Sequence, residues 1–363
     1  TTRERKENKM LFLPFFLLFV VVFGGGDVWD GRWVRHGPRP LRYDPTLCNV
    51  DPRETCKDTH TENVNQFSWW PSKASPFHLI EFSSETFEKC LAGKHVFMQG
   101  DSLVRNLHQS LNCLIAPHLR SSLTYNENAF LCHHLHPYDK QQQQLLKLSQ
   151  KFHGAIGMRE ENIYPTDPTL MLKQHLDFSN LGMVIIGTGI WYTATVFEDA
   201  KYVCKFPHNQ FYCDPVNDAF PKCIEITVDL LRELLIQHPD ILFVFLSSLP
   251  QHYRENAPFC PIPDHPDSFS WATNVTSRLY ELQKKIVSPL SSFPNFLFFD
   301  HFVMSSYRPD GHPGLDNGAR IRGGDCTHFC LPGVPDAWSG LLQQHYCYFT
   351  THKQTVFYTN KQY

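Results

Sequence analysis

The sequence predicts an α/β protein: a three-layer sandwich with a central parallel sheet between helices, plus a small loop-rich N-terminal module. The main observation is that short apolar runs alternate with segments of helical periodicity from about residue 91 onward, as in parallel sheets with helical crossovers. The chain has 363 residues, of which 42% are hydrophobic and 14% aromatic, enough to bury such a core in one main domain. Its formal net charge of −3 gives no reason to expect a nucleic-acid partner.

Residues 1–26 have the pattern of a signal peptide or a short signal anchor. An apolar run over residues 10–23 follows a stretch that contains four basic residues, which matches a basic region before a hydrophobic one. At about 14 residues the run suits a signal peptide better than a full membrane span, which needs about 20. Extension through Gly24-Gly25-Gly26 gives a short anchor. Two alternatives stay open: a cleaved, secreted protein, or one attached to the membrane through this segment.

Residues 27–90 form the predicted N-terminal module. This stretch is rich in Trp, Pro, His and Cys and lacks sustained periodicity, which is typical of loops and short strands. Cys48 and Cys56 are candidates to hold it together. The chain has 12 cysteines, none in a CxxC pair with zinc spacing, and with the N-terminal segment they favour disulfides formed in a secretory compartment. The sequon Asn274-Val275-Thr276 is compatible with a glycoprotein on the same route.

Residues 91–350 form the predicted main domain. Residues 95–99 are typical of a buried strand, and after a turn four leucines recur at helical spacing from Leu103 to Leu114. The later elements are a strand over 183–186, a helix around 222–237, a strand over 241–246, a helix around 271–287, a strand over 296–299 and a last helix that starts near Pro335 and Asp336. Residues 118–178 are polar and irregular and predict surface insertions, while residues 351–363 predict a tail.

Small polar residues follow three of the predicted strands. They are Ser102, the segment Gly187-Thr188-Gly189 and the pair Ser247-Ser248. Because ligands of open α/β sheets bind outside the carboxyl ends of the strands, we expect these residues at the same edge as the site.

Two short motifs supply a nucleophile, a base and an acid. Gly100-Asp101-Ser102 follows the first strand of the main domain, and Asp325-Cys326-Thr327-His328 lies near the C-terminus. A serine hydroxyl needs a neutral imidazole to take its proton and a carboxylate to orient that imidazole. The three-residue spacing allows Asp325 and His328 to face the same way, and a disulfide from Cys326 or Cys330 would hold their loop. The alternative for the first motif is an ordinary strand-to-helix turn with a helix cap.

Four segments of the chain carry a family resemblance. They are Gly31-Arg32-Trp33-Val34 with Tyr43 and Cys48, residues 100–106 (GDSLVRN), residues 307–313 (YRPDGHP) and residues 325–338 (DCTHFCLPGVPDAW). These segments resemble the plant trichome birefringence-like proteins, polysaccharide O-acetyltransferases of the PC-esterase type with a GDSL, SGNH-hydrolase-like fold. The resemblance spans roughly residues 29–346, and its last segment is the longest and most specific.

The resemblance implies an activity and roles for three residues. Residues 91–350 would be an esterase-like catalytic domain in which Ser102 is the nucleophile, His328 the general base and Asp325 its orienting acid. The implied reaction takes acetyl from a donor onto the serine and passes it to a hydroxyl of a cell-wall or matrix polysaccharide, with the donor as a co-substrate and no bound cofactor. The implied location is the Golgi membrane with a lumenal catalytic domain, or outside the cell if the N-terminal segment is cleaved.

The chain departs from the family pattern after its second strand. Where the family has Asn-Ser/Thr-Gly-His-Trp, this chain has residues 187–191 (GTGIW), so an amide and an imidazole are missing. Loss of an oxyanion donor costs on the order of 10²–10³ in rate. Backbone groups of Gly187 and Gly189, the Ser102 N–H and the side chain of Asn106 are candidate replacements, although Asn106 has an alternative interpretation as a structural amide. Phe329 replaces a family tryptophan, and the cysteine expected near Ala74-Ser75 is absent.

Three further residues are candidates for substrate binding. Arg105 would bind an acidic group, with an ion pair to Asp101 or a neighbouring loop as the alternative. Trp191 would stack on a sugar ring, with core packing as the alternative. His312 would shape the pocket, although the residues around it also favour a structural turn. The cluster Cys132-His133-His134-Leu135-His136 invites a metal interpretation, but it has no second ligand cluster with convincing spacing, and no metal is predicted.

The sequence leaves three functions open. The first is the O-acetyltransferase described above. The second is a carbohydrate acetyl-esterase with the same three residues, and the third is a catalytically weak glycan-binding or scaffold protein, which the changes at residues 187 and 190 favour.

Overall fold

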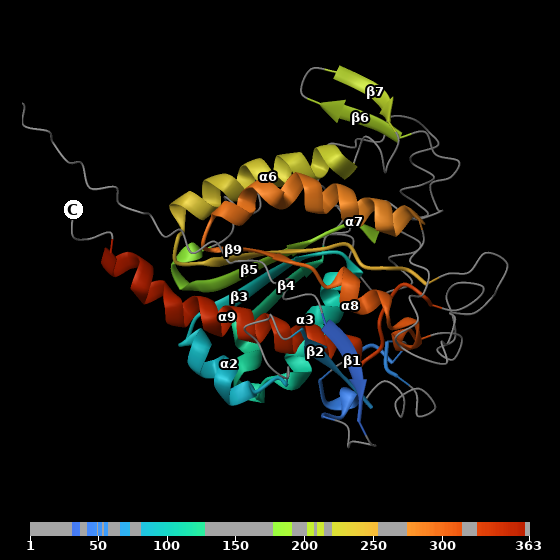
Figure 1. The fold of residues 1–363 in the computed structure, drawn as a ribbon, viewed down its shortest axis with the longest axis vertical. Helices are drawn as coiled ribbons and strands as arrows, with labels where there is room; N and C mark the ends of the chain where they lie inside the picture. Colours follow the sequence, from blue (N-terminus) through green and yellow to red (C-terminus); the bar gives the residue numbers. More distant parts are fainter. Residues whose placement is uncertain are drawn as a thin grey trace, which may run out of the picture.

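Five parallel strands form the central sheet (Figure 1). They lie in the spatial order β4 (Leu123–Glu127), β3 (His95–Gly100), β5 (Leu181–Gly187), β8 (Leu242–Leu246) and β9 (Phe296–Phe299). The first of them in the chain, β3, lies between β4 and β5, with parallel pairing on both sides. The strand order therefore reverses between β3 and β5, which is the topological switch point where doubly wound sheets bind ligands.

The structure is a computed structural model. It describes residues 31–36, 42–48, 50–52, 54–56, 66–72, 81–127, 177–190, 202–206, 209–213, 220–252, 274–313 and 325–359. The predicted signal segment, residues 1–26, lies outside these ranges. No helix within them is both long and apolar enough to cross a membrane.

Helices cover both faces of the sheet. The pair α6 (Phe220–Gln237) and α7 (Asn274–Val287) lies on one face, and α2 (Ser84–Leu91), α3 (Ser102–Leu114) and α9 (Val334–Thr359) lie on the other (Figure 1). Successive strand residues point to opposite faces, so Met98 packs with α3 and α9 while Phe97 packs with α6 and α7. The predicted three-layer α/β fold is thus confirmed.

The smaller elements lie around this sandwich. They are the strands β1 (Gly31–Arg35) and β2 (Phe67–Pro71), the hairpin of β6 (Tyr202–Phe206) and β7 (Asn209–Cys213), the helix α8 (Phe302–Ser306) and the 3₁₀ segments η1 (Pro45–Cys48), η2 (Pro117–Ser122), η4 (Phe178–Asn180), η8 (Ser288–Ser292) and η9 (Pro309–Gly311). The β6–β7 hairpin lies beyond α6 and α7, far from β1 and β2 (Figure 1).

One predicted segment assignment needs correction, and helices cross the predicted bounds of two other segments. The strand β4 lies within residues 118–178, predicted as surface insertions, and forms one edge of the sheet. Helix α2 begins in the predicted N-terminal module, residues 27–90, and ends one residue beyond it, and it packs on α9. Helix α9 continues to Thr359 and so includes most of the predicted tail.

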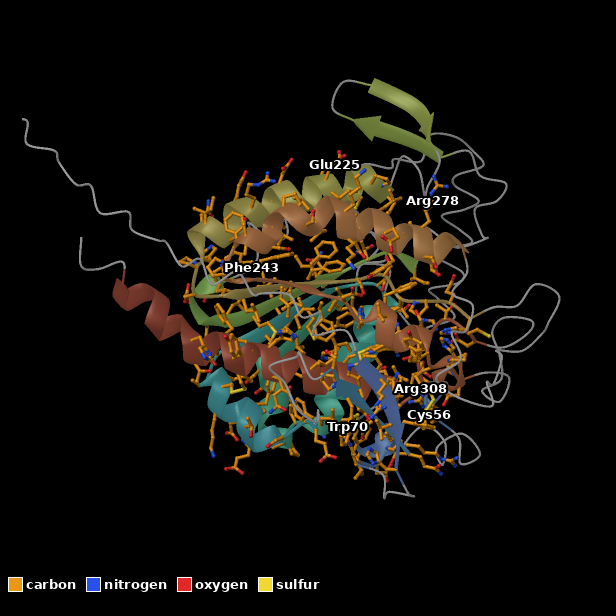
Figure 2. All side chains as sticks on the ribbon, in the orientation of Figure 1. Cys56, Trp70, Glu225, Phe243, Arg278 and Arg308 are labelled. Atoms are coloured by element: carbon orange, nitrogen blue, oxygen red, sulfur yellow. A yellow bond between two sulfur atoms is a disulfide. The ribbon has the colours of Figure 1, made fainter. Side chains whose placement is uncertain are left out.

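The two-stranded sheet of β1 and β2 is attached to the main domain through a buried arginine. The guanidinium carbon of Arg308 lies 4.5 Å from the ring centre of Trp33 and 4.8 Å from that of Phe67, within the range of a cation–π contact. Its Nε and Nη2 each donate to Asp310 at 2.8 Å. The indole N–H of Trp33 donates to the Met304 carbonyl at 2.8 Å. Figure 2 labels Arg308 beside these two strands.

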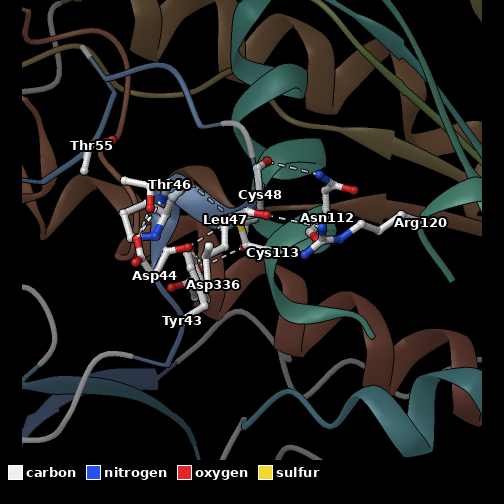
Figure 3. The surroundings of a disulfide bond; sticks show 12 residues. Tyr43, Asp44, Thr46, Leu47, Cys48, Thr55, Asn112, Cys113, Arg120 and Asp336 are labelled. Carbon is white, nitrogen blue, oxygen red and sulfur yellow. Dashed lines mark hydrogen bonds between the residues drawn. A yellow bond between two sulfur atoms is a disulfide. The ribbon is translucent and has the colours of Figure 1, made fainter. Parts of the chain in front are cut away.

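Within the described residues, three disulfides have both cysteines placed, and each joins distant parts of the sequence. They are Cys48–Cys113, Cys56–Cys330 and Cys90–Cys347. The first attaches η1 to the end of α3, where Asn112 also donates to the Cys48 carbonyl at 3.2 Å (Figure 3). No cysteine of the described residues is free, so the prediction of a disulfide-bonded protein is confirmed for this part of the chain.

Candidate active site

Ser102 lies where β3 meets α3, at the switch point of the sheet. Strand β3 ends at Gly100, Asp101 caps α3 by accepting the Leu103 N–H at 3.0 Å, and Ser102 is the first residue of the helix. Gly100 has no space for a side chain, because a Cβ there would collide with the carbonyl oxygen of Gly187 and with Val104. The glycine of the Gly-Asp-Ser motif thus allows β3, β5 and α3 to approach closely, and the turn brings the hydroxyl to the edge of the sheet.

The structure brings Ser102, His328 and Asp325 together in one chain of hydrogen bonds. His328 Nε2 lies 2.7 Å from Ser102 Oγ, and His328 Nδ1 lies 2.7 Å from Asp325 Oδ2. A carboxylate only accepts, so Nδ1 carries the proton toward Asp325. In the neutral ring Nε2 is then an acceptor that faces the serine hydroxyl. This is the arrangement that makes a serine nucleophilic.

The loop that carries His328 is held in place by several contacts. Asp325 Oδ1 accepts the backbone N–H groups of Thr327 and His328, each at 3.0 Å. Cys330 forms the disulfide with Cys56, and Cys326 is also disulfide-bonded. The expected disulfide support of this loop is therefore present, and the loop continues into α9 at Val334.

Asp325 makes His328 a stronger base. Burial by itself lowers the pKa of His328, but the charge of Asp325 and its hydrogen bond outweigh burial and raise the pKa to about 9. For Asp325, burial acts to raise the pKa, but the contacts with His328 and the bond from the Thr327 N–H hold it below its ordinary value. The two side chains therefore favour the charged pair, in which imidazolium and carboxylate stabilise each other.

Asp101 connects the turn of β3 to the end of β5. Its Oδ2 accepts the backbone N–H of Gly189 at 3.1 Å and that of Ile190 at 3.3 Å. Asp101 is 2% exposed, and burial raises its pKa to about 6 despite these bonds and the one from Leu103. The carboxylate thus uses the Gly189 N–H that the sequence suggested for an oxyanion.

Two of the other candidate oxyanion donors, Gly187 and Asn106, also lie in paired positions within the protein. Gly187 is the last residue of β5 and pairs with Gly100 and Leu246. Asn106 is fully buried on α3, and its amide donates to Glu54 and accepts the backbone N–H of Phe329. Their role as oxyanion donors stays a prediction, and the structural alternative for Asn106 matches the contacts that it makes.

Glu54, which the sequence did not single out, lies beside the candidate site. Its Oε1 is 2.6 Å from Arg105 Nη2, and its Oε2 accepts from Asn106 Nδ2 at 2.9 Å. Asn106 Oδ1 in turn accepts the Phe329 N–H at 3.2 Å. Arg105, a candidate for substrate binding, therefore forms an ion pair with a neighbouring segment, as its alternative interpretation stated. The only signal in the sequence was the position of Glu54 two residues before Cys56.

His312 packs behind the loop of His328. Its Nδ1 donates to the His328 carbonyl at 2.6 Å, and its Nε2 lies 2.6 Å from Nδ1 of His252. Both rings are buried, which lowers the pKa of His252 well below its ordinary value and that of His312 to about 4. These contacts give His312 a structural position and bring in His252, which no motif indicated. Its role in shaping the pocket stays a prediction.

A second serine–histidine contact lies deeper in the fold. Ser247 Oγ is 2.8 Å from His301 Nδ1 and also accepts the Phe302 N–H at 3.1 Å. Ser247 and His301 are 4% and 2% exposed. This pair follows β8 and β9 and braces the sheet edge, where the small residues after the strands were expected to gather.

Two predicted features lie outside the described residues. Trp191, a candidate for sugar stacking, and the cluster of residues 132–136 both fall there. Within the described ranges, no group of three or more His, Cys, Asp and Glu side chains has the arrangement of a metal site.

The fold and this site together define a class of protein: a doubly wound α/β protein of the SGNH-like type, with a serine–histidine–aspartate chain at its switch point. Residues 79–345 match the family model for PC-Esterase, described as a GDSL/SGNH-like acyl-esterase family found in Pmr5 and Cas1p. The match covers most of the chain, and the chain belongs to this family. Acyl transfer or ester hydrolysis is the chemistry of this class.

Similar proteins come from plants. The chain is 26% identical to protein trichome birefringence-like 4 of Arabidopsis thaliana, over 87% of this chain and 74% of that protein. It is 24% identical to xyloglucan O-acetyltransferase 1 of Populus trichocarpa, over 87% of this chain and 80% of that protein. The protein of the same name in Arabidopsis thaliana is also 24% identical, over 87% and 79%. The resemblance to the trichome birefringence-like proteins is confirmed.

Proposed function

We propose that this protein is an O-acetyltransferase that carries an acetyl group on Ser102 and passes it to a polysaccharide hydroxyl. The hydrogen-bonded chain from Ser102 through His328 to Asp325 carries this proposal. Similarity to two proteins named xyloglucan O-acetyltransferase supports a cell-wall polysaccharide as acceptor. The acetyl donor is a co-substrate, and the reaction needs no bound cofactor.

In the first half of the proposed reaction, Ser102 Oγ attacks the carbonyl carbon of the acetyl donor. His328 Nε2 takes the hydroxyl proton as the new carbon–oxygen bond forms, and Asp325 stabilises the resulting imidazolium. The tetrahedral intermediate then collapses, the bond to the leaving group breaks, and His328 returns the proton to that group. The products are an acetyl ester on Ser102 and the free leaving group.

In the second half, a sugar hydroxyl takes the place of the serine hydroxyl. His328 Nε2 accepts its proton as the sugar oxygen attacks the acetyl carbon. When the intermediate collapses, the bond to Ser102 Oγ breaks and the serine oxygen recovers a proton from His328. Water at the same position would release acetate instead, so transferase and esterase differ only in the hydroxyl that reaches the ester.

The Ser102 N–H is the oxyanion donor that we propose. Ser102 is the first residue of α3, a helix of 13 residues, and the first N–H groups of a helix have no acceptor within it. The helix dipole adds a partial positive charge at this end. Gly189 and Asn106 would first have to leave the partners that they have in the structure.

Replacement of the nucleophile tests the proposal. We expect the purified protein, incubated with 4-nitrophenyl acetate, to form an acetyl ester on Ser102 that mass spectrometry can detect. Addition of xyloglucan or another hydroxyl-bearing glycan should then remove the acetyl group from Ser102. Ser102→Ala should lose at least about 10³-fold in rate. Ser291→Ala, a change at an exposed serine, is the matched control. Full acetyl transfer by Ser102→Ala would exclude the mechanism.

An acetyl-esterase is the second candidate, favoured by the description of the family as acyl-esterases. Release of acetate from acetylated glycan, without transfer to any acceptor, would favour it.

A catalytically weak glycan-binding protein is the third candidate, motivated by the altered residues 187–190 and the engaged Gly189 N–H. This third candidate would be favoured if Ser102 does not react with a fluorophosphonate probe while the protein still binds glycan.

We propose a lumenal location for the catalytic domain. Disulfides form and persist in the secretory pathway, and those of the described residues support passage through it. The apolar segment over residues 10–23 would attach the protein to the Golgi membrane, with its catalytic domain in the lumen. If that segment is cleaved, the protein would be secreted. Protease protection in isolated Golgi vesicles would test it.

A further inference from the structure

Glu54 belongs to the N-terminal segment, yet its carboxylate is buried next to the helix of the nucleophile. The residue is 5% exposed. Its two carboxylate oxygens bind consecutive residues of α3, Arg105 at 2.6 Å and Asn106 at 2.9 Å. A buried carboxylate is costly unless it is paired and hydrogen-bonded, and both conditions are met here. The contacts join the N-terminal segment to the helix that begins at Ser102.

The same residue also contacts the loop of the general base. Asn106, which Glu54 holds, accepts the backbone N–H of Phe329, the residue after His328. The Glu54 carbonyl accepts the Leu331 N–H at 2.8 Å, and the Cys56 N–H donates to the Leu331 carbonyl at 2.9 Å. This short parallel bridge lies beside the Cys56–Cys330 disulfide. Side chain and main chain of residues 54–56 therefore hold both halves of the candidate site.

We infer that Glu54 is a positioning residue of the active site, which sets the place of the His328 loop against α3 and, with Arg105, the electrostatic environment of the ring. The inference rests on the proposed function of Ser102 and His328. The N-terminal module would thus contribute to catalysis by holding the loop of His328. Without residues 54–56 this loop would lose two backbone hydrogen bonds at Leu331 and the disulfide at Cys330. Arg105 acts in this arrangement as the partner of Glu54.

The two members of the ion pair act on His328 in opposite directions. The negative charge of Glu54 raises the pKa of His328 and the positive charge of Arg105 lowers it, although burial and Asp325 have larger effects. The ionisable groups that act on this ring from the surrounding elements are Asp325, Glu54, Arg105, Asp101 and His312. Removing one charge of a buried pair also leaves the other uncompensated, so the two single variants should shift the pKa of His328 in opposite directions.

The test compares Glu54→Gln and Arg105→Gln in the full protein, with Glu85→Gln as matched control. Glu85 also forms an ion pair at 2.6 Å, with Lys89, but both side chains are exposed on α2. We expect Glu54→Gln to lower kcat between about 10- and 100-fold, as for a misplaced catalytic group, with little change in KM, and to move the acid limb of the pH–rate profile to lower pH. Arg105→Gln should move that limb to higher pH, and Glu85→Gln should leave both quantities unchanged.

A second measurement separates this inference from the proposed function. The low-field proton resonance of the His328–Asp325 bond reports the titration of the ring by NMR, without turnover, and Asp325→Asn identifies the signal. Opposite shifts of this titration in the two variants would support the inference even if no acetyl transfer occurred. A folded Glu54→Gln with wild-type titration and kcat would overturn it, and so would an Arg105→Gln that changes only KM. If Glu54→Gln fails to fold, the direction of the Arg105→Gln shift decides.

Discussion

Asp325 holds His328 by both its ring and its backbone. One carboxylate oxygen accepts the ring Nδ1–H at 2.7 Å, and the other accepts the backbone N–H at 3.0 Å. The carboxylate thus sets the tautomer, the ring orientation and the loop conformation together.

We expect Asp325→Asn to lower kcat by about 10³- to 10⁴-fold, because an amide can stabilise the wrong tautomer of the imidazole and does not stabilise the imidazolium. Burial acts to lower the pKa of His328, but chiefly the charge of Asp325 and its hydrogen bond raise that pKa to about 9, so their removal should also move the acid limb of the pH–rate profile to lower pH. The rate of acetylation by 4-nitrophenyl acetate as a function of pH measures both. An unchanged acid limb would contradict the assignment of His328 as the base.

The stability of the protein should depend on the protonation of His328. Its pKa in the folded state, about 9, lies above the ordinary 6.5, so its stabilising contribution is complete below pH 6.5 and is lost as pH rises toward 9. The pKa of Asp325 is lowered from 3.8, so that contribution is lost as pH falls below 3.8. The difference in Tm between wild type and His328→Gln should therefore shrink from pH 6.5 to 9. A difference that grows over this range would be the opposite of our expectation.

Gly100→Ala should destabilise the fold more than a change at a glycine in open space. A Cβ at Gly100 would collide with backbone of β5 and with Val104, and such overpacking costs about 3 kcal/mol or more when backbone blocks the relief. At Gly93, a Cβ meets nothing within 4 Å and only the φ of 79° is unfavourable, which costs about 1 to 2 kcal/mol. Urea unfolding of the two alanine variants measures the difference. Equal losses would argue against the tight β3–β5 approach.

The Cys56–Cys330 disulfide should matter for activity as well as stability. It and Cys90–Cys347 link residues 274 and 257 apart in sequence, so removal of either should cost a similar stability, about 2 to 5 kcal/mol. Only the double variant Cys56→Ser/Cys330→Ser disturbs the loop of His328, and we expect it to lower kcat at a temperature where both variants are folded. The double variant Cys90→Ser/Cys347→Ser is the control. Equal kcat values would mean that the loop keeps its place without its disulfide.

Local patterns were sufficient to predict the sandwich and the place of Ser102 directly after a strand. The grouping of Ser102 with His328, 226 positions away, was predicted from the resemblance of the two motifs to a known family. The strand over residues 183–186 and the helix around 222–237 are strongly apolar or periodic, and the structure has both as β5 and α6. The strand β4 (LTYNE) was missed because it is short and polar, and only its pairing with β3 identifies it. Propensity and period carry little information for such an edge strand.

The supports of the site could not be predicted, because their partners are distant in sequence. Glu54 and Arg105 are 51 positions apart, and His252 and His312 are 60 apart. No periodicity connects such pairs, and a charged or aromatic residue alone does not name its partner. The same reason explains why the sequence offered the Gly189 N–H as an oxyanion donor, although Asp101 accepts its hydrogen bond.

The buried Arg308 bears on how a working fragment of this protein can be produced. The family match begins at residue 79, which suggests a natural place to cut. A fragment from there onward would lack Trp33 and Phe67, the two rings that cover the guanidinium. The guanidinium and the surface around it, which are buried in the full protein, would then be exposed to solvent. Recombinant expression should therefore begin before Gly31, and shorter fragments are expected to aggregate or to be degraded.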